Sequence, residues 1–348
     1  MPILPNVLER TILITLNRGP GPMMDLAGGL AFPALATAIK LGLFEAIDTQ
    51  SLTADEVAQR ISADPRGTGL LLDVLEALRY VEKKDHHYAN TKMSIKWILA
   101  SSPNSLACMI SGMEGALERW RYLEETIRAG SPPMLAWEWL DQHPGSWRDY
   151  QAIMIGMAHS CIEEIVTRVK LPPTAKRLID LGVGHGLYSI GFCKKYPNLS
   201  ACVFDWPQAR EIACETIQSE GMLERVTFQA GDLWVDDYGS GYDVALLFQI
   251  VHMYSPDKNI RLLTKVRDAL TPNARIVIND QVAVEAAGSL AKLIARLQGL
   301  ELLNSVNGQT YPPGEIVRWL VEAGFTNPTT VLLRNTPGFG VVVGTKPA

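Results

Sequence analysis

The sequence predicts an α/β protein in which a mostly parallel seven-stranded sheet follows an α-helical, winged-helix-like domain. From residue 177 onward, short apolar runs alternate with helical patterns, which is typical of a parallel sheet with crossover helices. Before residue 172, apolar residues recur mostly at helical spacing. We therefore expect three parts: an arm with the winged-helix-like domain over residues 1–100, a helical linker over residues 101–172, and the sheet domain over residues 173–348.

The N-terminal part begins with an apolar arm over residues 7–16. An apolar surface of this kind is typical of an interface, so we expect the arm to pack on a second copy of the chain. A long helix follows, because apolar residues share one helical face. This face is expected to contain Leu35, Ala38, Ile39, Leu43 and Ile47.

Two further helices and a hairpin are expected before residue 95. Thr53 begins a Thr-Ala-Asp-Glu capping box, and Asp64 before Pro65 is a second helix start. Residues 79–83 and 87–91 flank a polar turn and predict the hairpin. The helix after Asp64 has few basic residues, so dimerisation is favoured over DNA binding for this module. The inward face of the helix after Asp64 is expected to contain Leu71, Val74, Leu75 and Leu78.

The linker contains many large aromatic and sulfur-containing side chains. We expect five of them to enclose a hydrophobic, aromatic or conjugated small molecule between the domains. These are Trp137, Trp147, Tyr150, Met154 and Met157.

Seven strands are predicted in the last part of the chain. A turn at residues 335–338 indicates that the last two form a hairpin, so the final strand runs opposite to its neighbours. The predicted strands are 177–181, 201–205, 226–230, 243–250, 274–279, 329–334 and 339–345.

A glycine at every second position follows the first of these strands, at Gly182, Gly184 and Gly186. Glycines there let the backbone approach a ligand and turn without a Cβ clash. A dinucleotide fingerprint needs a third glycine where the chain has Leu187 or Ser189, so that interpretation is disfavoured. The pattern resembles the S-adenosylmethionine loop of class I methyltransferases. In such a loop Asp180 is expected to hold the cationic amino-acid head of the ligand at the strand end.

Polar residues also end the next three strands. Asp205 is suited to a bidentate hydrogen bond with ribose hydroxyls. Asp232 is placed to accept from an adenine amine, and Leu233 to cover the ring. His252 follows the fourth strand, and its ordinary pKa near 6.5 suits proton abstraction.

The ordering of these landmarks resembles two-domain, metal-independent O-methyltransferases related to caffeic acid and hydroxyindole O-methyltransferases, of the bacterial small-molecule type. The resemblance covers residues 32–348. Its landmarks are residues 38–44, 88–91, 180–186, 205–207, 231–232, 272–280 and 322–325.

The resemblance implies a homodimer with a Rossmann-like domain that binds S-adenosylmethionine and releases S-adenosylhomocysteine. It also implies that His252 is the general base, that Asp280 orients its imidazole, and that Gln249 helps to hold the cofactor. Met157 resembles a methionine that packs on the acceptor ring.

Two positions depart from the family pattern. Thr310 replaces a glutamate that usually flanks the histidine, and Met253-Tyr254 replaces Asp-Trp. These changes weaken the assignment of an ordinary phenol acceptor. Methyl transfer to carbon or nitrogen, with His252 orienting the acceptor, is therefore the alternative. A winged-helix regulator that senses S-adenosylmethionine and a nicotinamide oxidoreductase are the other classes considered.

Composition limits the remaining partners. The net charge of −5 argues against nucleic acid, because no basic excess exists to neutralise phosphates. The five cysteines form no Cys-x-x-Cys pair and have no metal-ligand spacing, so we expect reduced thiols, a cytoplasmic location and no metal. We find neither a signal-peptide pattern nor a run of about 20 apolar residues, so no membrane span is expected.

Overall fold

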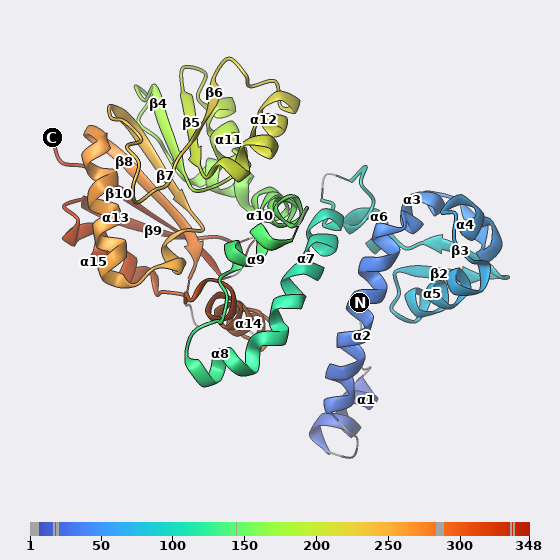
Figure 1. Cartoon of the computed structure of the whole chain (residues 1–348). Helices are drawn as coiled ribbons and strands as arrows, with labels where there is room; N and C mark the ends of the chain where they lie inside the picture. Colours follow the sequence, from blue (N-terminus) through green and yellow to red (C-terminus); the bar gives the residue numbers. More distant parts are fainter. Residues whose placement is uncertain are drawn as a thin grey trace. The chain divides into compact units, whose positions relative to one another are not determined.

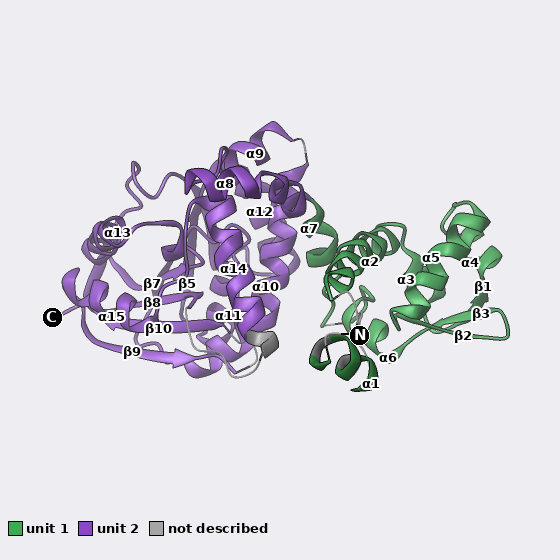
Figure 2. Ribbon diagram, turned by 90° about the horizontal axis from the view of Figure 1, so that it is seen from below, with its two compact units in different colours: residues 1–114 green, residues 115–348 purple. Residues whose placement is uncertain are grey.

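The computed structural model of the chain describes residues 7–16, 18, 21–102, 104–143, 145–282, 289–334, 336 and 338–348. The chain divides into two compact units, residues 1–114 and 115–348 (Figure 2). The boundary lies inside helix α7 (Ala107–Arg119), so most of the predicted linker belongs to the same unit as the sheet. The residues expected to enclose the acceptor therefore lie within one unit and not between two.

The first unit contains an arm, helices of varied length and a three-stranded sheet of order β1-β3-β2 (Figure 1). The hairpin prediction is confirmed, because β2 and β3 pair antiparallel. The elements are α1 (Val7–Arg10), a π-helical turn η1 (Thr11–Thr15), α2 (Pro22–Lys40), α3 (Leu43–Ile47), β1 (Ser51–Thr53), α4 (Ala54–Arg60), α5 (Pro65–Ala77), β2 (Val81–Lys84), β3 (His87–Asn90) and α6 (Lys92–Trp97).

Both predicted helix starts are confirmed. Thr53 Oγ1 accepts from the Glu56 N–H, and Glu56 accepts from the Thr53 N–H at 2.7 Å. Asp64 Oδ1 accepts from the Gly67 N–H at 2.8 Å. These bonds satisfy backbone donors that the first helical turn leaves free.

Two details of the predicted first unit are wrong. The first apolar face is divided between α2 and α3, because Gly42 takes a left-handed φ of 68° and ends the run. In α5 the Val74 side chain is 43% exposed, and Leu72 is buried in its place. Val74 and Leu72 are two positions apart and lie on different faces of the helix, so the buried face is rotated from the predicted one.

Helix α2 also bears on the expectation that the chain contains no membrane-spanning stretch. Among the described residues it is long and apolar enough to cross a membrane, by length and composition alone. Leu35, Ala36 and Ala38 of this helix are buried inside the unit.

The second unit contains a seven-stranded sheet with helices on both faces (Figure 1). Its strands are β4 (Arg177–Leu181), β5 (Ser200–Asp205), β6 (Val226–Ala230), β7 (Tyr242–Phe248), β8 (Leu270–Gln281), β9 (Thr326–Leu332) and β10 (Phe339–Thr345). Its helices are the end of α7 (Ala107–Arg119), η2 (Trp120–Tyr122), α8 (Leu123–Ala129), α9 (Ala136–Gln142), α10 (Ser146–Arg168), α11 (Leu187–Lys195), η3 (Pro207–Ala209), α12 (Arg210–Ser219), η4 (Val251–Met253), α13 (Pro256–Ala269), α14 (Ser289–Val306) and α15 (Pro313–Glu322).

The strand order is β6-β5-β4-β7-β8-β10-β9, and all seven predicted strands are confirmed. In this order, β6, β5, β4, β7 and β8 pair parallel with their neighbours. Strand β10 runs antiparallel to both β8 and β9. The predicted terminal hairpin is therefore present. Residues 335 and 337 of its predicted turn lie outside the described residues.

Apolar residues on alternate strand positions form one core on each face of the sheet. Phe192 and Ile165 pack with Val203 on the face covered by α10 and α11. Leu263 and Trp319 pack on the other face, covered by α13 and α15. Because both faces are covered, polar groups gather at the carboxyl ends of the parallel strands, where ligands bind in folds of this type.

Candidate functional site

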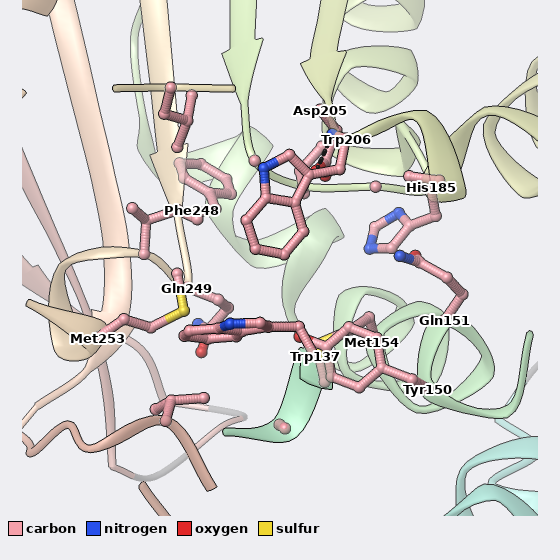
Figure 3. Close-up of a pocket in the computed structure, with 18 of the residues that line it drawn as sticks. Trp137, Tyr150, Gln151, Met154, His185, Asp205, Trp206, Phe248, Gln249 and Met253 are labelled. Atoms are coloured by element: carbon pink, nitrogen blue, oxygen red, sulfur yellow. Dashed lines mark hydrogen bonds between the residues drawn. The ribbon is translucent and has the colours of Figure 1, made fainter. Parts of the chain in front are cut away.

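A cavity of about 260 Å³ lies at the carboxyl ends of β4, β5, β6 and β7, within the second unit (Figure 3). Helices α9 and α10 supply its opposite wall. Of the residues expected at a cofactor site, Gly182, Gly184, Asp205, Asp232, Leu233 and Gln249 line it. All five residues expected around the acceptor line it as well: Trp137, Trp147, Tyr150, Met154 and Met157.

The glycine-rich loop after β4 has left-handed backbone at Gly182, Gly184 and Gly186, with φ between 67° and 76°. A Cβ on Gly182 would overlap Ile250, and one on Gly184 would overlap the Gln151 amide. Larger residues are excluded on conformational and steric grounds. The loop therefore keeps its backbone directly on the cavity.

Asp180 is not among the described residues that line the cavity. It is completely buried, and its Oδ2 accepts from Ser189 Oγ at 2.8 Å. Burial raises the pKa of this carboxyl to about 7. This Oδ2 joins β4 to α11 behind the loop, whereas Oδ1 is buried without a partner, so the expected contact with a cationic head stays a prediction.

Asp205 ends β5 and is half-buried at the cavity wall. Its Oδ1 accepts from the Trp206 N–H at 2.6 Å, which fixes the carboxyl orientation. Burial raises its pKa to about 6, and backbone N–H groups of Trp206 and Gly184 partly oppose this shift. The remaining lone pairs are suited to a pair of ligand hydroxyls.

Asp232 and Leu233 follow β6 as expected. Asp232 Oδ1 accepts from the Trp234 N–H at 2.7 Å, so the turn uses one carboxylate oxygen. The turn does not use its other oxygen, which is available to an amine donor. Leu233 is buried beside it and presents an apolar surface to the cavity.

Gln249 follows β7 with a left-handed φ of 59°, which is uncommon for a residue with a side chain. Its N–H donates to Asn279 O at 2.8 Å, which holds this conformation. The Gln249 Oε1 accepts from Gln281 Nε2 at 3.5 Å, and Gln249 Nε2 is buried without a partner. Strained backbone and an unpaired donor at a cavity wall are typical of a ligand contact.

The opposite wall is aromatic and rich in sulfur. The Trp206 ring meets those of Trp137 and Trp147 edge to face, with centroids 5.8 Å and 6.4 Å apart. Figure 3 shows Trp137 and Met154 facing the pocket from the helical side. Burial, followed by the charge of Asp205, raises the pKa of Tyr150 to about 12, so its hydroxyl stays neutral. This wall is suited to a flat, apolar molecule.

His252 and Asp280 form a buried hydrogen-bonded pair. His252 Nδ1 lies 2.6 Å from Asp280 Oδ1, and the His252 N–H donates to Asp280 Oδ2 at 3.2 Å. Because a carboxylate can only accept, the ring hydrogen is on Nδ1 and the lone pair is on Nε2. His252 is 6% exposed and does not itself line the cavity, but the next residue, Met253, does.

Thr310 is half-buried in the loop after α14 and is absent from the described cavity lining. This loop contacts the histidine through the backbone, since the Gln309 N–H donates to His252 O at 2.9 Å. A Cβ on Gly308 would overlap that same carbonyl. The structure therefore brings Thr310 near His252 but not to the cavity wall.

Sequence reasoning missed two buried polar residues of the lining, Gln151 and His185. His185 lies inside the glycine motif, so its position was a usable signal. Gln151 lies on α10, a helix of mixed composition, where only the fold shows which residue the loop meets. Within the described residues, no group of three or more His, Cys, Asp or Glu side chains is arranged to hold a metal ion.

Sequence comparisons agree with this geometry. A model of the O-methyltransferase domain matches residues 120–326, and a model of the O-methyltransferase dimerisation domain matches residues 24–101. A 3-hydroxy-5-methyl-1-naphthoate 3-O-methyltransferase of Streptomyces sahachiroi is 27% identical over 94% of this chain and 95% of its own length. The tetracenomycin 8-O-methyltransferase TcmO of Streptomyces glaucescens is 26% identical over 95% of this chain and 98% of its own length.

Solved structures share the fold. Human N-acetylserotonin methyltransferase, in complex with S-adenosylmethionine, superposes with a TM-score of 0.81 at 21% identity over the whole of both chains. PigF, with S-adenosylhomocysteine bound, gives 0.77 at 21% identity over 93% of this chain and 98% of its own. The family model covers more than half of the sequence, so this chain belongs to the O-methyltransferase family and is an S-adenosylmethionine-dependent methyltransferase.

Proposed function

We propose that the enzyme methylates a hydroxyl group of a hydrophobic aromatic small molecule, with His252 as the general base. The observation that carries this proposal is the His252–Asp280 hydrogen bond at the end of β7, next to a cavity-lining residue. The bond leaves Nε2 of the neutral ring as a proton acceptor. An imidazole with this tautomer is suited to general-base catalysis near neutral pH.

The residues of the cavity fit S-adenosylmethionine. The glycine loop leaves room for a ligand against its backbone, and Gln249 has an unpaired buried donor. Asp205 would hold the ribose hydroxyls, while Asp232 and Leu233 would hold the adenine. When bound, the cofactor supplies an electrophilic methyl group on a sulfonium.

The protein contributes mainly alignment and proton removal. Orientation of two reactants in one cavity is worth ~7–11 kcal/mol of the barrier. His252 would take the hydroxyl proton on Nε2, and Asp280 would stabilise the resulting imidazolium through Nδ1–H. Met157 and Met154 would pack on the acceptor ring, since thioethers adapt to flat apolar surfaces.

Relatives support an aromatic acceptor. Besides the naphthoate enzyme, a 3-amino-4-hydroxybenzoate 4-O-methyltransferase of Streptomyces cremeus is 28% identical over 86% of this chain. One relative favours transfer to carbon: an L-tyrosine C(3)-methyltransferase of Streptomyces lavendulae, 22% identical over 92% of this chain. Carbon methylation is therefore the second candidate, with His252 orienting the acceptor.

A labelled-methyl assay tests the proposal. The enzyme is incubated with methyl-labelled S-adenosylmethionine and a panel of hydroxynaphthoates, hydroxybenzoates and L-tyrosine, and products are located by mass spectrometry and NMR. We expect the label on a phenolic oxygen. A label on a ring carbon would replace the proposal with the second candidate, and an absence of transfer to every phenol would contradict the acceptor class.

We also propose a homodimer. The dimerisation-domain match covers α2 to α6, and apolar residues on α1 and α2 face solvent in the single chain. Val7, Leu8 and Leu30 are 85%, 69% and 69% exposed. A second copy that covers them would remove a costly apolar surface from water.

Light scattering at micromolar concentration should give about twice the 38.3 kDa chain mass. Leu30→Glu should shift this value towards the monomer, and Leu223→Glu, on an exposed turn of the second unit, is the matched control. A monomeric native chain would overturn the proposal.

The thiols of all five cysteines are free of disulfide bonds, which supports a cytoplasmic location in a reducing compartment.

A further inference from the structure

The charges of the cavity are one-sided. Asp205 and Asp232 line it, whereas no Lys or Arg is present in the described part of the lining. An amino-acid ligand has both an ammonium and a carboxylate, and the carboxylate needs donors. In this cavity those donors must be neutral groups.

His185 is such a donor. Its Nδ1 accepts from the Leu187 N–H at 3.1 Å, so in the neutral ring the hydrogen is on Nε2. Burial lowers its pKa to about 3, with a smaller contribution from His159, and the ring is therefore neutral near pH 7. The ring lines the cavity and is 1% exposed.

Gln151 supplies the complementary acceptor. It extends from α10, is 5% exposed, and its Oε1 is buried without a partner. Its amide occupies the place where a side chain on Gly184 would be, so it lies directly against the glycine loop. Figure 3 shows Gln151 and His185 on the same side of the pocket. A buried acceptor left unpaired is costly unless a ligand satisfies it.

We propose that His185 and Gln151 bind the amino-acid end of the cofactor, with His185 Nε2–H donating to its carboxylate and Gln151 Oε1 accepting from its ammonium. This inference rests on the assignment of S-adenosylmethionine to the cavity. It gives Gln151 and His185 a share in the task that sequence reasoning assigned to Asp180. It also explains why the loop needs glycine at 184, since any side chain would displace the Gln151 amide.

Calorimetry with two ligands tests the inference without any acceptor. S-Adenosylhomocysteine has the amino-acid end, and 5′-methylthioadenosine has the same adenosine and thioether without it. His185→Phe keeps a ring but removes both nitrogens, and Gln151→Met keeps length but removes the amide. Each variant should weaken the binding of S-adenosylhomocysteine by about 10- to 100-fold, as expected for loss of a hydrogen bond to a charged group. Each variant should change the affinity for 5′-methylthioadenosine by less than about 3-fold.

The outcomes separate three cases. Equal losses for both ligands would show that the residues only support the loop, and would overturn the inference. Unchanged affinity for S-adenosylhomocysteine in both variants would also overturn it. Failure of the native protein to bind either ligand would overturn the cofactor assignment itself. Gln151→Met lies on α10, so it still tests the inference if His185→Phe disturbs the loop.

Discussion

The two buried histidines at the carboxyl edge of the sheet have opposite hydrogen-bonding arrangements. His252 Nδ1 faces a carboxylate, which can only accept, so Nε2 is a base. His185 Nδ1 faces a backbone N–H, which can only donate, so Nε2 carries the hydrogen. They follow β7 and β4, which are paired neighbours in the sheet.

This difference shows that one atom behind each ring determines its chemistry. Strand ends deliver both side chains to the same edge, yet one ring is suited to take a proton and the other to hold an anion. A single substitution behind or at either ring should therefore affect one function and leave the other intact. The predictions below test that separation.

The largest expected effect is at His252. His252→Gln should lower turnover by about 10²–10⁴-fold, because a positioned base contributes that much. Affinity for S-adenosylhomocysteine should stay within about 3-fold. The loss should shrink at high pH, where a phenol with a pKa near 10 ionises without help.

His159→Gln, at an exposed histidine of α10, is the matched control and should have native turnover. Native turnover of His252→Gln at neutral pH would remove the base role. Asp280→Asn should lower turnover by less than His252→Gln does, because the imidazole remains in place.

The next effect concerns Asp205, which we place at the adenosine end of the cavity, apart from the His185 end that we propose for the amino-acid group. Asp205→Ala should weaken the binding of S-adenosylhomocysteine and of 5′-methylthioadenosine equally, by about 10²-fold, because each lost charged hydrogen bond costs ~1.5–3 kcal/mol. Calorimetry with both ligands measures it, and Asp257→Ala, an exposed acid of α13, is the control. Unchanged affinity would exclude Asp205 from the site.

Acidic pH should have a smaller, related effect. The Asp205 pKa is raised to about 6, so the carboxylate is lost as pH falls through that value. Adenosine-ligand affinity should fall about 10-fold from pH 7.5 to pH 5. Asp180 and Tyr150 are the titratable neighbours that interact electrostatically with Asp205. Asp205→Asn should abolish this pH dependence, and a dependence that persists in the variant would assign it to Asp180.

Asp180→Asn should have the smallest effect on binding and a visible effect on stability. The Asp180 pKa is about 7 in the folded protein against an ordinary 3.8, so the folded state loses stability as pH rises from about 4 through 7. The variant keeps an acceptor for Ser189 and removes the buried charge. Its melting temperature should exceed the native value by several degrees at pH 8 and by less at pH 5. A loss of S-adenosylhomocysteine affinity beyond about 10-fold would return Asp180 to the binding site.

The sheet and its strand ends were predictable because their signals are local. Apolar runs, alternate glycines and the acids after β5 and β6 lie within a few residues of each other, and the sheet edge brings them together. The burial of Asp180 was not predictable, because it depends on which way one side chain of β4 points. Partners across long sequence distances, such as Gln151 against Gly184, depend on how α10 packs.

The proposed acceptor end was predictable only in composition. Its aromatic and sulfur-containing residues line the cavity as expected, but Thr310 does not, because the backbone of its loop contacts His252 instead. The Val74 error has a similar origin. Helical spacing defines an apolar face only approximately, and tertiary packing decides which residues at its edge are buried.

Nitrogen NMR of the imidazole rings tests the central claim most directly. The chain has six histidines, and His252→Gln and His185→Gln identify the two signals after ¹⁵N-histidine labelling. We predict that near pH 7.5 His252 is protonated on Nδ1 with a free Nε2, and that His185 is protonated on Nε2 with a free Nδ1. Protonation of Nε2 in a neutral His252 ring would contradict the base role, and the same tautomer in both rings would contradict the separation between them.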